Sequence, residues 1–218
     1  MPDSARFLIF LTAAVLLAIA PGPGMLYVLA RSLAGGRREG LLSAIGTFFG
    51  GMVHVFAAAA GISIILAKSA LAFAAVKYLG AAYLCFLGTR MIIEARKDSG
   101  AEIPMAAGET LAPSLQRRGN PLWQGLLTEA LNPKTALFFL SFIPQFVDHS
   151  RGHVFAQFIV LGAISVTLNT TADIFVTVLA GPIGHRIRES ARFRRRQRTA
   201  TGAIMIGLGA YLALGESK

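Results

Sequence analysis

The stretch Ala20-Pro21-Gly22-Pro23-Gly24 interrupts the first long apolar run of the sequence, residues 7–30, which contains no charged residue. A helix of that length rises about 36 Å, enough to cross the ~30 Å hydrocarbon layer of a membrane. Each proline removes an N–H donor and clashes with the preceding turn, and the glycines weaken the helix further. Broken backbone at membrane depth is tolerated where it is buried in protein or lines a wet cavity. The stretch therefore predicts a broken transmembrane helix with a binding site at the break; a plain proline kink without a ligand is the alternative.

The composition is typical of a membrane protein. Of the 218 residues, 54% are hydrophobic and only 15% are charged, whereas an average soluble domain has about 25% charged residues. The only cysteine, Cys85, lies in an apolar run and excludes an intramolecular disulfide.

Six apolar runs follow one another along the chain. They are residues 7–30, 41–67, 70–93, 122–147, 154–181 and 200–214. The first five are long enough to span a membrane, but the last falls short of the ~20 residues that a span needs, so a five-span arrangement stays open. The fold class we predict is all-α, a polytopic transmembrane bundle of about six helices.

The basic residues predict the orientation of these runs. Fifteen Lys and Arg residues fall in the segments 31–38, 90–118 and 186–198, and four fall at the opposite ends of the runs. The positive-inside rule then places the three basic segments in the cytoplasm and both termini outside. The arginine-rich segment 192–198 resembles a nucleic-acid patch, but its place between two membrane runs favours contact with anionic lipid headgroups instead. We therefore expect the lipid bilayer, and no nucleic acid, as a partner.

The chain divides into two related halves. Residues 1–93 and 122–218 each contain three runs, and the hydrophilic segment 94–121 reads as a cytoplasmic connector between them. The first run of the second half is interrupted by Asn132-Pro133-Lys134 and by Pro144, as the first run of the chain is by its prolines. Three spans per half would invert the second half relative to the first, and paired interruptions in inverted halves point to the substrate site of a transporter. Helix ends that meet there offer N–H groups to a carboxylate and carbonyls to an ammonium, as an amino acid requires.

Small and polar residues in the second run share one helix face. This face holds Ser43, Thr47, Gly51, His54, Ala58 and Gly61. A histidine at this depth can exchange protons near neutral pH, although a neutral, hydrogen-bonded packing role is an equal alternative. Gly46 and Gly50 form a GxxxG pair on a nearby stripe, which suits close helix approach.

A second polar stripe lies in the fifth run, where residues recur every four positions. It consists of Ser165, Asn169, Asp173 and Thr177. A charge at the bilayer centre costs about 2.5–3.5 kcal/mol, so this stripe should face the bundle interior, with Asp173 as a candidate proton carrier or as part of a structural hydrogen-bond cluster. Lys134 is a candidate partner of Asp173, of Glu129 or of a substrate carboxylate, while Glu129 lies closer to a span end where it could reach water.

Together these motifs resemble the LysE/RhtB family of bacterial inner-membrane amino-acid exporters, which includes homoserine, threonine and leucine efflux proteins. The matching motifs are Pro21-Gly22-Pro23-Gly24, the Gly46 to His54 segment, Gly80-Ala81-Ala82-Tyr83-Leu84 with Gly88, Asn132-Pro133-Lys134, Pro144-Gln145-Phe146 and the region of Asp173. The resemblance implies export powered by the proton gradient, with the interrupted first and fourth spans central to transport. Two positions depart from it. Many members have an acid at the position of Gly51, and members often have asparagine at the position of Glu129.

We therefore predict an inner-membrane exporter of small amino acids or their derivatives. The expected substrate-binding residues are Pro21, Gly22, Pro23, Gly24, Asn132, Pro133, Lys134 and Asn169, and the expected proton-coupling residues are Asp173 and His54. No enzyme motif, metal-ligand spacing or phosphate loop is present, so no catalysis, cofactor or metal site is predicted. Stripes of small residues permit a homodimer. A cation or heavy-metal exporter, disfavoured by the scarcity of soft ligands, and a membrane scaffold without transport are the alternatives.

Overall fold

The computed structural model describes residues 4–68, 70–97, 119–148, 150, 152–189 and 191–214. The helices are α1 (Ser4–Ile19), α2 (Pro23–Lys68), α3 (Ala70–Lys97), α5 (Pro121–Ala130), α6 (Pro133–Leu137), the π-helix η1 (Phe138–Phe142), the 3-10 helix η2 (Ile143–Phe146), α7 (Val154–Glu189) and α8 (Ala191–Leu214). No strand occurs in these described ranges, so the predicted all-α class is confirmed there. Most of the expected connector, residues 98–118, lies outside the described residues.

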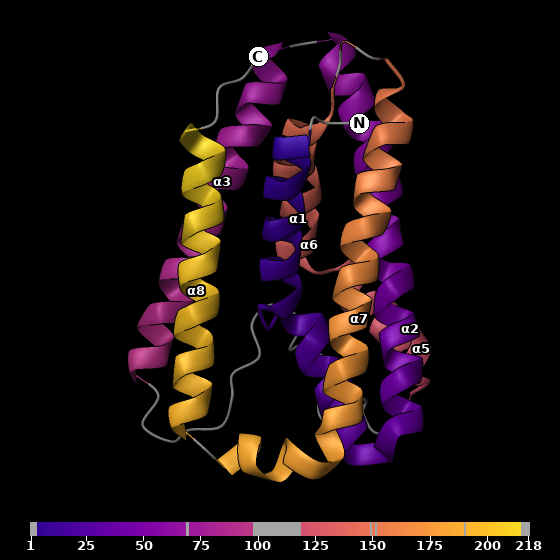
Figure 1. Cartoon of the computed structure of the whole chain (residues 1–218), viewed down its shortest axis with the longest axis vertical. Coiled ribbons are helices and arrows are strands. Elements are labelled where there is room, and N and C mark those ends of the chain that lie inside the picture. Colours follow the sequence, from indigo (N-terminus) through magenta and orange to yellow (C-terminus); the bar gives the residue numbers. More distant parts are fainter. Residues whose placement is uncertain are drawn as a thin grey trace.

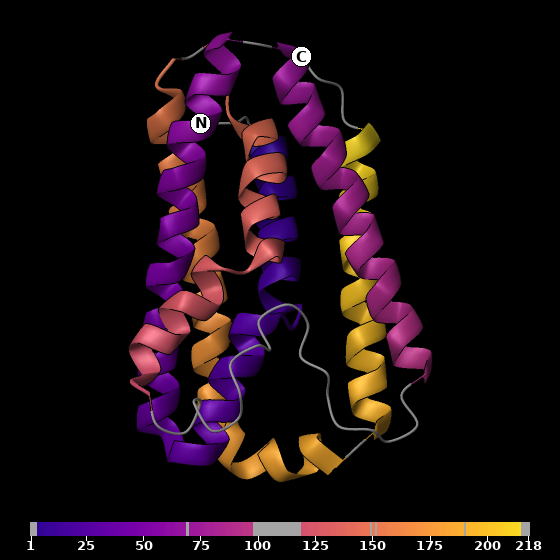
Figure 2. The same cartoon turned by 180° about the vertical axis from the view of Figure 1, so that it is seen from behind.

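The helices run along the long axis of an elongated bundle (Figure 1). The start of α1 and the end of α8 lie at one end of this bundle, which we call the Ser4 end (Figures 1 and 2). At the opposite end, which we call the Gly36 end, α2 turns back on itself. Gly36 has φ 75° and ψ −172°, a positive φ that glycine adopts at little cost. A loop was expected between the first two runs, but this single glycine makes the turn.

The sixth run also differs from its expected bounds. It was expected to begin near residue 200, but α8 begins at Ala191, so the arginine-rich segment 192–198 forms the first turns of the helix and not a loop. Arg195 and Arg196 are exposed there.

Both predicted helix interruptions are present. α1 ends at Ile19 and α2 begins at Pro23, while α5 ends at Ala130 and α6 begins at Pro133. Proline stands at the first position of α2 and of α6, where its missing N–H has no intrahelical partner to lose. The prolines therefore start the second helix of each pair, and the breaks fall in the residues before them.

Glycines bring the helices close together. α2 packs against α5 and α7, and α3 packs against α8. A Cβ atom on Gly46 would overlap the carbonyl oxygen of Leu122, and one on Gly50 would approach that of Leu126. The predicted close approach at the GxxxG pair is therefore present, and its partner is α5. Between α3 and α8 the contact is reciprocal, because a Cβ on either Gly88 or Gly202 would lie 2.5 Å from the other's carbonyl oxygen.

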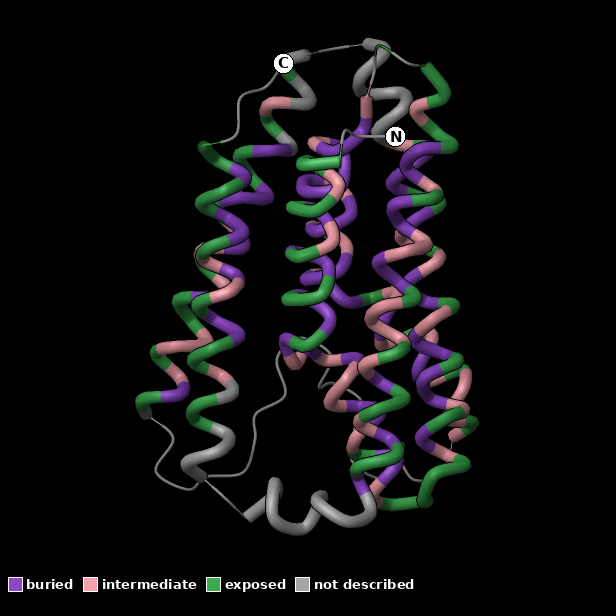
Figure 3. Tube along the Cα trace, in the orientation of Figure 1, coloured by how far each residue is buried: buried purple, intermediate pink, exposed green. Residues whose placement is uncertain are grey.

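The outer surface of the bundle is apolar. Exposed residues lie on the outward faces of the helices, and buried residues face inward (Figure 3). Large exposed apolar side chains include Leu8, Ile19, Phe56, Leu79, Phe86, Trp123 and Phe175. Such a surface suits lipid contact. By length and composition, Pro23–Gly61 and Val154–Ala180 qualify as membrane spans among the described residues, although the first range includes the turn at Gly36, and Ser4–Ile19 and Arg198–Leu214 are shorter apolar helices. The six spans and the inverted relation of the halves stay predictions.

Candidate functional site

The two helix breaks meet through Lys134. Its Nζ donates to the carbonyl oxygens of Ala20 at 2.9 Å and of Leu17 at 3.4 Å. The last carbonyls of a helix have no intrahelical partner, so a cation is well placed there. A Cβ on Gly22 would lie 2.9 Å from this Nζ, which shows that the close approach depends on glycine. The first break is therefore covered by protein from the second half of the chain.

Asn132 explains the Asn-Pro-Lys sequence of the second break. Its Oδ1 accepts a hydrogen bond from the backbone N–H of Lys134 at 3.1 Å and so caps α6. Its Nδ2 donates to Oε2 of Glu129 at 3.1 Å. The asparagine starts the helix, Pro133 occupies its first position, and Lys134 points from there toward α1.

Glu129 lies inside the site, so the alternative in which it reaches water is wrong. Only 3% of its surface is exposed. Its Oε1 accepts from the hydroxyl of Thr135 at 2.6 Å, and a Cβ on Gly24 would overlap its Oε2. The carboxylate therefore faces the first turn of α2, where the helix dipole favours negative charge.

His54 contacts the second break from α2. Its Nε2 lies 2.8 Å from the carbonyl oxygen of Glu129, so this nitrogen carries the hydrogen and donates it. The ring stacks on Phe139 with a centroid distance of 6.4 Å and an interplanar angle of 8°. These contacts fix the imidazole beside the break, while its role in proton transfer stays a prediction.

The polar stripe of α7 faces the bundle interior, as predicted. Ser165, Asp173 and Thr177 are buried, and Asn169 is partly buried. Oδ2 of Asp173 accepts from the hydroxyl of Thr47 at 2.9 Å. Its Oδ1 is buried and has no hydrogen-bond partner among the described residues. A buried acceptor without a hydrogen bond is rare in proteins and needs an explanation.

Some of these residues line a cavity of about 20 Å³, which we call the central cavity, but Asn132, His54, Asp173 and residues 20–24 do not line it. It is lined by Ala14, Leu17, Ala18, Thr47, Gly51, Glu129, Lys134, Thr135, Phe138, Phe139, Ser165, Val166 and Asn169. Of the predicted site residues, Lys134 and Asn169 line it, while Asp173 lies behind Thr47. The cavity has room for about one water molecule, so an amino acid would fit only if its walls moved apart.

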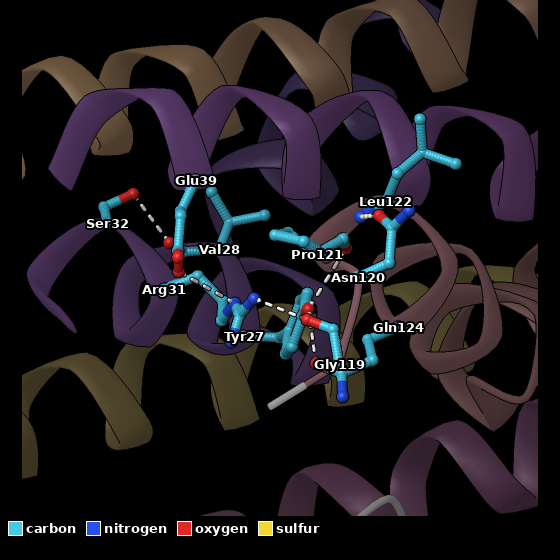
Figure 4. A network of polar contacts seen from close by, with 10 residues as sticks. All are labelled: Tyr27, Val28, Arg31, Ser32, Glu39, Gly119, Asn120, Pro121, Leu122 and Gln124. Carbon is cyan, nitrogen blue, oxygen red and sulfur yellow. Dashed lines mark hydrogen bonds and ion pairs between the residues drawn. The ribbon is translucent and has the colours of Figure 1, made fainter. Parts of the chain in front are cut away.

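A polar network joins the part of α2 that follows the first break to residues 119–124 (Figure 4). The hydroxyl of Tyr27 lies 3.1 Å from both the carbonyl oxygen of Pro121 and Oε1 of Gln124. Nη2 of Arg31 donates to the carbonyl oxygen of Gly119 at 3.0 Å. Its Nε lies 3.3 Å from Oε2 of Glu39, a distance that suits an ion pair although the geometry is not that of a hydrogen bond. These contacts, which we call the Tyr27–Arg31 network, tie the first part of α2 to the segment that begins α5.

Aromatic side chains pack together where α1, η1 and η2 meet. The rings of Phe10 and Phe146 lie 5.6 Å apart, and those of Phe138 and Phe142 lie 5.0 Å apart. All four residues are buried in the main hydrophobic cluster. We call these four side chains the aromatic layer, and Phe138 among them lines the central cavity.

Sequence reasoning missed the roles of Tyr27 and Arg31. Arg31 was counted among the basic residues that set orientation, yet only 5% of its surface is exposed, and Tyr27 is 3% exposed. Their spacing of four residues places them on one helix face, which was the only signal available. The sequence does not show that this face meets backbone carbonyls of a distant segment.

Two helix breaks that meet through Lys134, beside a cavity lined by the buried charges of Glu129 and Lys134, indicate the class of the protein, a helical membrane transporter. The comparisons give the family: the model of the LysE type translocator matches residues 15–216. The chain belongs to this family, so the predicted resemblance is confirmed.

Relatives match over nearly the whole length of the chain. An uncharacterized membrane protein of Vibrio cholerae is 32% identical over 99% of this chain and 100% of its own. An uncharacterized membrane protein of Pseudomonas aeruginosa is 35% identical over 95% of this chain and 94% of its own. The leucine efflux protein of Salmonella typhimurium is 30% identical over 95% of this chain and 94% of its own. No solved structure matches.

Proposed function

We propose that this protein exports small amino acids of the homoserine, threonine and leucine class across the bacterial inner membrane, driven by the proton gradient. In this proposal the halves 1–93 and 122–218 form six spans, and the basic segments face the cytoplasm. The family and the Salmonella leucine efflux proteins support amino-acid export.

The observation that carries the proposal is the contact of Lys134 with the carbonyl oxygen of Ala20 beside the central cavity. It joins unwound backbone from both halves at one place. Residues 21–24 and 132–134, together with Asn169, are the proposed substrate-binding residues. Apolar walls from α1 and η1 leave room for an aliphatic side chain once the cavity widens.

Transport would alternate between opening at the two ends of the bundle. Opening at the Gly36 end requires the Tyr27–Arg31 network to separate, and opening at the Ser4 end requires the aromatic layer to separate. The break between α1 and α2 and the turn at Gly36 supply the points at which the first part of α2 would move.

Proton coupling is assigned to Asp173, with His54 as a second candidate. Asp173 is fully buried and is linked to the cavity wall by one hydrogen bond from Thr47. A carboxylate in that place needs a proton or a partner, because an isolated buried charge is unfavourable. Binding of a proton on one side and its release on the other would alternate with substrate binding.

The test is counterflow in proteoliposomes. Vesicles preloaded with unlabelled leucine, threonine or homoserine should accumulate the labelled amino acid, and an imposed pH gradient should drive accumulation without preloading. Vesicles with divalent metal ions in place of amino acids test the cation-exporter alternative. A membrane scaffold would move none of these solutes, and that result would refute the proposal.

A further inference from the structure

The central cavity contains two opposite charges that are not paired with each other. Glu129 is 3% exposed and Lys134 is 6% exposed, and both line the cavity. The ammonium of Lys134 binds the carbonyl oxygens of Leu17 and Ala20. The carboxylate of Glu129 accepts from the amide of Asn132 and the hydroxyl of Thr135. Each charge is thus held by neutral groups, and no ion pair joins them in the described part of the chain.

This arrangement is unfavourable without a further partner. Burying a charge costs free energy that a direct counter-ion in good geometry would offset. Both charges stand on the same segment of chain, five residues apart, yet their hydrogen-bond partners hold them away from each other. Asn132 and Thr135 direct the carboxylate toward the first turn of α2, while the end of α1 holds the ammonium.

We propose that Glu129 and Lys134 bind the two charged groups of a zwitterionic amino-acid substrate. The carboxylate of Glu129 binds the α-ammonium group of the substrate, and the ammonium of Lys134 binds the α-carboxylate. The inference rests on the proposed function and deepens it, because it makes both groups of the free amino acid a requirement. Glu129 is then a specificity-determining residue that sequence reasoning did not include in the site.

The same geometry links binding to movement. The substrate carboxylate competes with the carbonyl oxygens of Ala20 and Leu17 for the ammonium of Lys134, because a charged acceptor binds it more strongly than a neutral one. When the lysine turns to the substrate, the end of α1 loses its cap. The break between α1 and α2 is then free to change shape, as widening of the cavity requires.

The first test uses wild-type protein and compounds that lack one charge of leucine. Proteoliposomes preloaded with leucine take up labelled leucine in competition with unlabelled leucine, with 4-methylpentanoate, which lacks the amino group, or with 3-methylbutylamine, which lacks the carboxylate. We expect each analogue to compete roughly 30-fold or more weakly than leucine, since each leaves one buried charge unpaired. If 4-methylpentanoate or 3-methylbutylamine competes as well as leucine, the inference is wrong although the proposed function stands. If no amino acid of the class exchanges at all, the proposed function itself fails.

Variants then show which residue binds which charged group of the substrate. Glu129→Gln should lose the discrimination against 4-methylpentanoate and keep that against 3-methylbutylamine, and Lys134→Gln should do the reverse. Glu129→Asp keeps the carboxylate and should therefore keep the discrimination against both analogues. Glu94→Gln is the matched control, because Glu94 makes an exposed ion pair with Arg90 on α3. Ligand-induced shifts in melting temperature give the same comparison for a variant that binds without transport. If leucine and the two analogues all lost affinity to the same extent in both glutamine variants, the assignment would be overturned.

Discussion

The Nζ of Lys134 caps the carbonyl oxygen of Ala20 at 2.9 Å, although 114 residues separate them in sequence. One helix interruption therefore completes the hydrogen bonding of the other. This answers the question that unwound backbone raises in a membrane, where freed carbonyls need partners within the protein. The contact also links the two breaks, so a substitution at one break should alter the structure of the other.

The glycine at position 22 should be essential to this contact. In Gly22→Ala the new methyl group would lie 2.9 Å from Nζ and 3.3 Å from Cδ of Lys134, so the lysine must withdraw. We expect leucine counterflow to fall about tenfold, the effect of losing one hydrogen bond to a charged group. Gly207→Ala is the control, because a Cβ there meets nothing within 4 Å. Equal counterflow in the two variants would contradict the account.

The Tyr27–Arg31 network should hold the Gly36 end closed. The reporter is Ser165→Cys in a Cys85→Ala background, since Cys85 is the only native cysteine and Ser165 lines the cavity. Tyr27→Phe removes the hydroxyl contacts to Pro121 and Gln124, and we expect a water-soluble maleimide applied from the Gly36 end to react about fivefold faster.

The control for this measurement is Tyr78→Phe, because Tyr78 is 54% exposed. It removes the same hydroxyl group from α3 and should leave the rate of modification unchanged. An unchanged rate in Tyr27→Phe as well would show that the network does not close this end.

Asp173 should be required for coupling and dispensable for exchange. Asp173→Asn keeps the shape of the side chain and its acceptor oxygen for Thr47 but removes the titratable group. We expect counterflow of leucine to persist, while accumulation driven by an imposed pH gradient disappears. Gradient-driven accumulation at the wild-type level in Asp173→Asn would remove this residue from the coupling mechanism.

The reciprocal glycine contact between α3 and α8 should act on stability alone. In Gly88→Ala the added methyl group would lie 2.5 Å from the carbonyl oxygen of Gly202, a backbone atom. We expect a loss of about 1–3 kcal/mol, the usual effect of overpacking, seen as a lower melting temperature in detergent. The preference among amino acids should not change. A wild-type melting temperature would show that the two helices separate easily.

Local sequence patterns predicted the features that depend on neighbouring residues alone, which are the helix breaks, the buried polar stripe and the close glycine contact. The proline and glycine content at residues 20–24 predicted the first break, and Asn132-Pro133 predicted the second. The four-residue spacing through Asp173 predicted a buried stripe because it reports which side of a helix avoids lipid. The GxxxG pair predicted a close contact, although it did not identify α5 as the partner.

What sequence reasoning could not supply was the partner of each polar group. Lys134 was expected to bind a carboxylate or a substrate, yet it binds carbonyl oxygens of α1. Glu129 was left between pairing with Lys134 and reaching water, yet it does neither, and Asn132 and Thr135 bind its carboxylate inside the bundle. Helical periodicity gives the direction of a side chain and not the distant backbone that it meets. The turn at Gly36 was missed for a related reason, since one positive-φ glycine can replace a loop.

The central claim is that the cavity between the two breaks is the amino-acid site, and substrate protection of a cysteine there tests it most directly. Ser165→Cys and Glu94→Cys, each in the Cys85→Ala background, place one thiol in the cavity and one on the exposed surface of α3. The account predicts that leucine slows modification of the Ser165→Cys protein and leaves that of the Glu94→Cys protein unchanged. Transport of leucine by both proteins without any protection at position 165 would contradict it.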